Sequence, residues 1–172
     1  PAGSKAICFA KRTLEIWDRL GVAEAMLEKG VRWEVGKVYR GAREDLVYQF
    51  DLLSVKDQKM PASINLQQYY AEEFLLRRLQ QMTNVQIRWG HEVVAMNPAR
   101  DGVSVSVQCA GGNYSIHTDW LIACDGSKSR IRQLLGLDFA GRVFEDNFLI
   151  ADVKVQENRP VERMFWFDPP FN

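Results

Sequence analysis

Cysteine and histidine are scarce in this sequence of 172 residues, which contains three cysteines and two histidines. Cys8, Cys109 and Cys124 are odd in number and far apart, which favours reduced thiols in a cytoplasmic protein over a disulfide framework. Neither His91 nor His117 stands at a metal-ligand spacing from a cysteine or from the other histidine. We therefore expect no metal site.

An excess of charge of one sign is also missing, because 22 basic and 22 acidic side chains cancel. This balance gives no reason to expect nucleic acid or an anionic membrane as a partner. No apolar stretch approaches the roughly 20 residues needed to cross a bilayer, and residues 1–5 do not form a signal peptide. The expected partner is a small molecule or another protein.

The helical period appears in three places. Apolar residues recur three and four apart from Lys11 to Lys29, which predicts two short helices separated at Gly21, the second closed by Gly30. A further helix is predicted from Gln68 to Met82. A short one is predicted at about Ser129–Leu135.

Strand-forming runs fill much of the remaining chain. Val35–Leu53 predicts a hairpin around a polar turn at 41–45, and tight turns are expected at Asp101-Gly102 and Gly111-Gly112-Asn113. The last two strands are expected to be antiparallel. Further strands are predicted at Val85–Trp89, Glu92–Met96, Val103–Cys109, Tyr114–Cys124, Phe148–Val155 and Val161–Phe167. Together the elements predict an α/β layer architecture with a largely antiparallel sheet attached.

One junction carries most of the functional information. The apolar run Trp120-Leu121-Ile122-Ala123-Cys124 stops at Asp125-Gly126, and a basic helical segment follows. Gly126 would let a ligand approach the backbone closely, and Asp125 could accept a hydrogen bond from a ribose hydroxyl. Ser127 or Ser129 could cap the helix and leave its first N–H groups facing an anion such as a pyrophosphate. Asp-Gly is also a frequent turn pair without any function.

The string from Asp119 to Gly136 resembles the Asp-Gly fingerprint of the flavoprotein aromatic hydroxylases, which are single-component FAD monooxygenases. In that family a serine follows three positions after the glycine, and an arginine three after that. Here these residues are Asp125, Gly126, Ser129 and Arg132. The closest resemblance is to the phenol and 3-hydroxyphenylpropionate hydroxylase branch, within the broader para-hydroxybenzoate hydroxylase fold.

Two other stretches are similar to the same family. Ser4–Val22 looks like the segment after the second strand, where a basic residue stands beside the flavin, and Lys5 takes that place. Lysine keeps the charge but lacks the planar fork of arginine, and it could also be a solvated terminal charge. Ile64–Leu79 looks like a strand-to-helix junction at which Gln68 reaches the flavin, unless Gln68 merely satisfies backbone groups.

The resemblance implies part of a Rossmann-like domain that binds FAD and NAD(P)H. Residues 1–140 would form the partial FAD-binding domain, with the hairpin 35–53 facing the substrate side, and residues 141–172 would begin the substrate-binding sheet. The implied reaction is hydroxylation of a small aromatic substrate by NADH or NADPH and O₂. The cofactor supplies the chemistry, while the protein supplies position and a dry pocket.

Aromatic residues of the predicted strands are candidates for the pocket wall, with sheet core as the alternative. They are Tyr39, Tyr48, Phe50 and Trp166. No paired carboxylates and no nucleophile–histidine arrangement stand out, so we assign no catalytic acid or base. Exposed strand edges near the C-terminal end would allow a second copy to pair, which makes a homodimer an expectation.

Two glycine motifs of the family are missing from the sequence: the Gly-x-Gly-x-x-Gly turn and the later Gly-Asp element. Because an initiating methionine and a closing element are missing too, we expect a middle piece of a longer polypeptide. This piece alone should bind FAD weakly or not at all.

Two alternatives remain open. A related flavoprotein of the same fold, such as a halogenase or a reductase, would give a different product. A non-catalytic remnant would bind a partner or ligand without flavin, and a start codon directly before Pro1 would favour it. A Gly-x-Gly-x-x-Gly turn upstream of Pro1 would favour the enzyme.

Overall fold

The structure is a computed structural model that describes residues 7–41, 46–52, 57–142, 144–145, 149, 151 and 160–169. The chain forms two compact units, one made of Pro1–Val85 with Lys154–Asn172 and the other of Gln86–Val153. Each unit is described by itself. Within the described residues, no helix combines the length and the apolar character that a membrane crossing requires.

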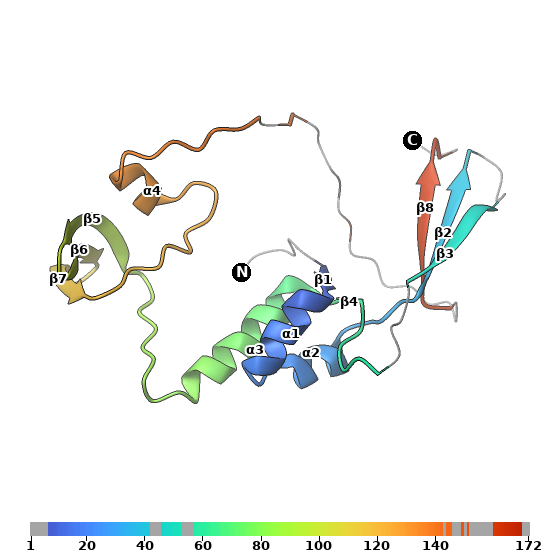
Figure 1. The fold of residues 1–172 in the computed structure, drawn as a ribbon, viewed down its shortest axis with the longest axis horizontal. Helices are drawn as coiled ribbons and strands as arrows, with labels where there is room; N and C mark the ends of the chain where they lie inside the picture. The colour runs from blue at the N-terminus through green and yellow to red at the C-terminus, as the bar shows by residue number, and fades with distance from the viewer. Residues whose placement is uncertain are drawn as a thin grey trace. The chain divides into compact units, whose positions relative to one another are not determined.

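The first unit holds three helices around one core (Figure 1). Helix α1 (Lys11–Arg19) buries Leu14 and Trp17 on one face, and α2 (Ala23–Lys29) buries Met26 against them. As predicted, the chain breaks between these helices at Gly21, and α3 (Gln68–Gln80) begins at Gln68. Strand β1 (Cys8–Ala10) pairs antiparallel with β4 (Ser63–Asn65), whose Ile64 is fully buried in the same core.

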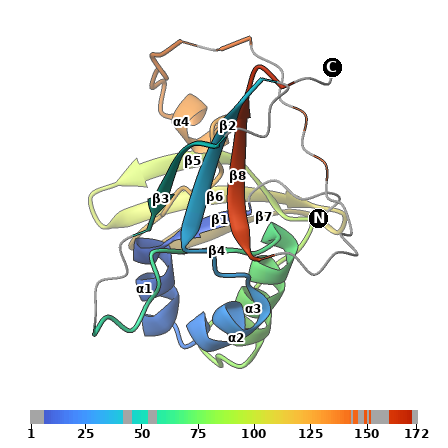
Figure 2. The same cartoon turned by 90° about the vertical axis from the view of Figure 1, so that its right-hand side faces the viewer.

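A separate three-stranded sheet in this unit has β2 (Val35–Arg40) at its centre (Figure 2). The predicted hairpin is confirmed, because β3 (Leu46–Asp51) pairs antiparallel with β2, while residues 42–45 of its turn lie outside the described residues. Strand β8 (Glu162–Phe167) lies along the other edge and is parallel to β2. The sheet therefore joins segments that are more than a hundred residues apart in the sequence.

The second unit is an antiparallel meander of β5 (Glu92–Ala99), β6 (Gly102–Cys109) and β7 (Gly112–Thr118). Alternate residues of β6 are buried, because Val103, Val105 and Val107 face one side and serines face the other. Helix α4 (Arg130–Leu134) lies against β5. The two glycine turns predicted between these strands are both present.

One predicted strand is wrong, and another is predicted too long at its C-terminal end. Residues 85–89 form no strand, and β7 ends at Thr118, so the run 119–124 is not the end of a strand either. A strand needs a neighbour to satisfy its backbone groups, and neither run has one among the described residues. Trp120 and Ile122 are accordingly more than 80% exposed.

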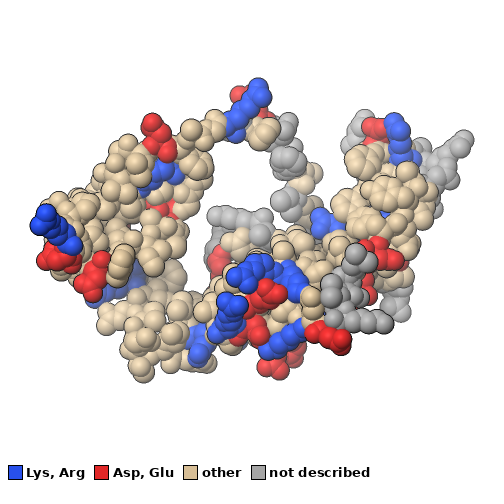
Figure 3. All heavy atoms as spheres, viewed as in Figure 1, with Lys and Arg blue, Asp and Glu red and all other residues tan. Residues whose placement is uncertain are grey.

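Strand β8 pairs in parallel with β2, a neighbour that the sequence did not predict. Its expected partner, Phe148–Val155, falls largely outside the described residues. On the face shown in Figure 3, basic and acidic side chains intermingle over the helices of the first unit. That mixture agrees with the zero net charge of the sequence.

Candidate functional site

Asp125 joins the end of the apolar segment 119–124 to the start of α4. Its carboxylate accepts two hydrogen bonds: Ser129 Oγ donates to Oδ1 at 2.6 Å, and the backbone N–H of Ile131 donates to Oδ2 at 3.1 Å. The first N–H groups of a helix lack partners within the helix, so these bonds stabilise its start. Asp125 therefore fixes where α4 begins.

Ser129 is the N-cap of α4 and is buried. Its Oγ accepts a hydrogen bond from the backbone N–H of Arg132 at 3.1 Å while it donates to Asp125. The guanidinium of Arg132 in turn donates to the backbone oxygen of Ser127 at 2.8 Å. The structure thus brings together Asp125, Gly126, Ser129 and Arg132, which we call the Asp-Gly corner.

The hydrogen bonds at this corner change one expectation. The sequence suggested that the first N–H groups of the helix would face an anion. Those of Ile131 and Arg132 are instead used by Asp125 and Ser129. Because α4 has only five residues, these capping bonds use much of the N–H capacity that its N-terminus could offer to an anion.

The same bonds keep Asp125 ionised. Donation from the Ser129 hydroxyl, followed by donation from the Ile131 N–H, lowers the pKa of the Asp125 carboxyl below its ordinary value of 3.8. The backbone N–H groups of Asp125 itself and of Arg130 also lower this pKa.

Gly126 leaves the corner open. It has a φ of +79°, and a Cβ added there would meet no heavy atom within 4 Å. Asp125 also lines a cavity of about 370 Å³ within the second unit, together with His91, Leu121, Cys124 and Ile131. The corner is thus not sealed by side chains, and the residues present fit a ligand that brings a hydroxyl donor close to the backbone.

The hydrogen bond from Ser129 to Asp125 can be tested through the pKa of the carboxyl. We expect Ser129→Ala to raise the pKa of Asp125 toward 3.8, because the largest cause of its lowering is removed. Loss of the buried N-cap should also lower the free energy of unfolding by about 1 kcal/mol at pH 7. Carbon-detected NMR titration and urea denaturation measure the two effects.

The sign of the pH dependence follows from the lowered pKa. A carboxyl with a lower pKa in the folded state stabilises the fold above its unfolded value of 3.8, and this contribution is lost as the pH falls through the folded value. The difference between wild type and Ser129→Ala should therefore shrink on acidification below 3.8. Ser127→Ala is the control, and an unchanged Asp125 pKa in Ser129→Ala would contradict the network.

The other predicted cofactor residues lie in the first unit. Gln68 is the first residue of α3, and its side-chain amide donates to Glu72 Oε1 at 2.6 Å, one helical turn along. This is an i, i+4 pair between side chains on the helix surface, and not a contact with the backbone. Lys5 lies outside the described residues.

The four predicted pocket aromatics are divided between the two faces of the sheet β3-β2-β8. Tyr39 stacks on Trp166 with ring centroids 4.5 Å apart, and these two residues are register partners on β2 and β8. Tyr48 and Phe50 pair with Val38 and Gly36, which point to the opposite face. Each face therefore carries one pair of the candidates.

A family comparison now adds to this geometry. A family model described as the FAD binding domain matches residues 2–167. The chain belongs to this FAD-binding domain family. The match confirms the flavoprotein resemblance inferred from the Asp-Gly fingerprint and from the stretches Ser4–Val22 and Ile64–Leu79.

Relatives of this FAD-binding domain are monooxygenases. A 12-dehydrotetracycline 5-monooxygenase/anhydrotetracycline 6-monooxygenase of Streptomyces rimosus is 34% identical over 91% of this chain and 30% of its own length. A para-nitrophenol 4-monooxygenase of a Pseudomonas species is 26% identical over 87% of this chain and 37% of its own length. The chain thus spans about a third of the length of these curated relatives.

The fold of the FAD-binding domain is also found among solved structures. A p-nitrophenol 4-monooxygenase from Pseudomonas putida superimposes with a TM-score of 0.75, at 23% identity, over 84% of this chain and 36% of that one. At this identity the likeness shows the fold alone. The fold agrees with the predicted α/β class with antiparallel sheets.

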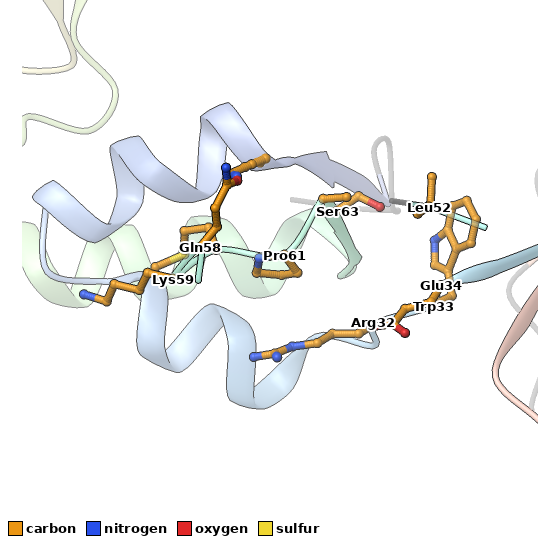
Figure 4. Close-up of a pocket in the computed structure, with 11 residues that line it drawn as sticks. Arg32, Trp33, Glu34, Leu52, Gln58, Lys59, Pro61 and Ser63 are labelled. Carbon is orange, nitrogen blue, oxygen red and sulfur yellow. The ribbon is translucent and has the colours of Figure 1, made fainter. Parts of the chain in front are cut away.

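Sequence reasoning missed two polar features of this domain. Lys37 Nζ and Glu162 Oε2 form an ion pair of 2.6 Å between β2 and β8. Trp33 and Ser63 line a pocket that no motif indicated (Figure 4). Both features join residues that are distant in the sequence, so no local pattern could have revealed them.

Proposed function

We propose that the complete protein is an FAD-dependent monooxygenase that hydroxylates a phenolic or other aromatic substrate with NAD(P)H and O₂. The observation that carries the proposal is the family match over nearly the whole chain, which includes an intact Asp-Gly corner. The relatives named above, which act on anhydrotetracycline and para-nitrophenol, support the substrate class.

In this proposal Asp125 binds the sugar part of FAD. Its lowered pKa keeps it an acceptor at neutral pH, and its bonds to Ser129 and Ile131 orient the carboxylate. Gly126 admits the cofactor close to the backbone, because no side chain fills the space beside it. Ser129 and Arg132 act as positioning residues that hold the corner in shape.

The chemistry that FAD supplies when bound is transfer of reducing equivalents from NAD(P)H to O₂, so that one oxygen atom enters the aromatic ring and the other leaves as water. The chain contributes position and exclusion of water. We assign the substrate side to the sheet β3-β2-β8, where aromatic residues of the hairpin 35–53 and of β8 meet. Residues 141–172 would then begin the substrate domain.

Several parts of the proposal concern the whole protein. NAD(P)H as the reductant, a cytoplasmic location and association into homodimers belong to it. Lys5 and Gln68 are proposed to lie beside the flavin. Residues 1–172 alone are expected to bind FAD weakly or not at all.

The proposal predicts that the purified complete protein is yellow and that a phenolic compound accelerates its oxidation of NADH or NADPH. The measurements are the visible absorption spectrum and the decay of absorbance at the nicotinamide band, with and without a panel of phenols. A colourless complete protein that ignores added FAD would contradict the proposal and favour a remnant without flavin.

A further inference from the structure

We propose that Phe139 is a positioning residue of the Asp-Gly corner and that it holds the guanidinium of Arg132 in place for the binding of FAD. Phe139 lies beyond the end of α4, and its ring centroid is 4.6 Å from the guanidinium carbon of Arg132. The residue is 72% exposed, so burial in a core does not account for its place. This role rests on the proposed function, because FAD is the ligand that the corner would bind.

The backbone of Arg132 is fixed from both ends of α4. Its N–H donates to Oγ of Ser129, the N-cap, at 3.1 Å. Its backbone oxygen accepts from the N–H of Leu137 at 3.1 Å, while the N–H of Gly136 donates to the backbone oxygen of Gln133 at 3.0 Å. With Gly136 at a φ of +65°, these two bonds form a Schellman motif at the end of the helix. The turn therefore carries the next residues of the chain back toward the Arg132 side chain.

The side chain of Arg132 contacts both the backbone of the corner and the Phe139 ring. Its Nη2 donates to the backbone oxygen of Ser127 at 2.8 Å, and the ring lies beside the guanidinium carbon. The negative face of an aromatic ring attracts a guanidinium. The ring therefore favours those positions of the Arg132 side chain in which the bond to Ser127 can form.

The bond from Arg132 reaches the part of the backbone that the cofactor is proposed to approach. Ser127 directly follows Gly126, which has a φ of +79° and no side chain of its own to restrict it. A hydrogen bond to the Ser127 oxygen limits rotation of the peptide beside Gly126. A backbone that is already held in one conformation loses less entropy when a ligand binds. Phe139 thus raises the affinity of the corner for FAD by acting through Arg132.

The test measures two properties of the complete protein: FAD affinity by flavin fluorescence and the Nε–H signal of Arg132 by ¹⁵N NMR. Phe139→Leu should weaken FAD binding about threefold and shift the Arg132 signal, which is assigned by its loss in Arg132→Gln. Phe139→Tyr keeps an aromatic ring and should behave as the wild type in both measurements. Phe144→Leu is the matched control, because Phe144 is 78% exposed and makes no ring contact among the described residues. It should change neither property.

The Arg132→Gln background separates action through Arg132 from a direct contact between Phe139 and FAD. In that background Phe139→Leu should weaken FAD binding no further, because the group that the ring positions is already gone. Equal losses of FAD affinity in both backgrounds would overturn the proposal. An Arg132 signal that stays in place in Phe139→Leu would also overturn it, whether or not the protein binds FAD. A shifted signal in a protein without affinity for FAD would instead confirm the contact and overturn the proposed function, and with it the role of Phe139 in FAD binding.

Discussion

Gly126→Ala should lower the affinity of the complete protein for FAD at least tenfold. In the proposed site the cofactor approaches the backbone where Gly126 now leaves open space, and a methyl group would occupy that space. Tenfold corresponds to about 1.4 kcal/mol of binding free energy. Titration of the apoprotein with FAD, followed by flavin fluorescence, measures the change.

Gly136→Ala is the matched control for this substitution. Gly136 follows α4, has a φ of +65°, and like Gly126 has no heavy atom within 4 Å of an added Cβ. Both substitutions should therefore cost about 1–2 kcal/mol of folding stability through left-handed backbone strain. Only Gly126→Ala should also weaken FAD binding, and equal FAD affinities of the two variants would contradict the role of the corner.

Gly36→Ala should destabilise the sheet β3-β2-β8 by about 1–3 kcal/mol through overpacking. A Cβ at Gly36 would stand 2.2 Å from Cζ of Phe50, its register partner on β3, and within 2.7 Å of both Cε atoms. The Phe50 ring lies across the glycine, so one of the two must move. Urea denaturation of the variant, followed by tryptophan fluorescence, measures the loss of unfolding free energy.

The Phe50→Leu background shows whether this contact is the cause. Leucine lacks the Cε and Cζ atoms that approach Gly36 most closely. Gly36→Ala should therefore cost at least 0.5 kcal/mol less in the Phe50→Leu protein than in the wild type, the coupling expected for residues in contact. An equal loss of unfolding free energy for Gly36→Ala in both backgrounds would show that contact with the Phe50 ring is not the cause.

The elements that the sequence predicted well are those whose signal is local. The helix break at Gly21, the start of α3 at Gln68 and the strands of the meander depend on spacing within one segment, and all are present. The Asp-Gly corner was found because its residues lie within eight positions of one another. Its internal hydrogen bonds give a physical reason for that spacing.

The features that sequence reasoning missed depend on partners from elsewhere in the chain. The run Trp120–Cys124 has strong strand propensity, but propensity forms a strand only where a neighbour accepts its backbone bonds. The parallel pairing of β8 with β2 and the Lys37–Glu162 ion pair have the same origin. The division of the four aromatics between two faces follows from register, which a sequence alone does not reveal.

We propose that this chain is part of an enzyme that places oxygen from O₂ on an aromatic ring. The most direct test of this proposal is mass spectrometry of the product formed by the complete protein with NAD(P)H, an accepted phenol and ¹⁸O₂. The expected product is hydroxylated and contains one ¹⁸O atom per turnover. A product that is halogenated, reduced or labelled only from water would contradict it.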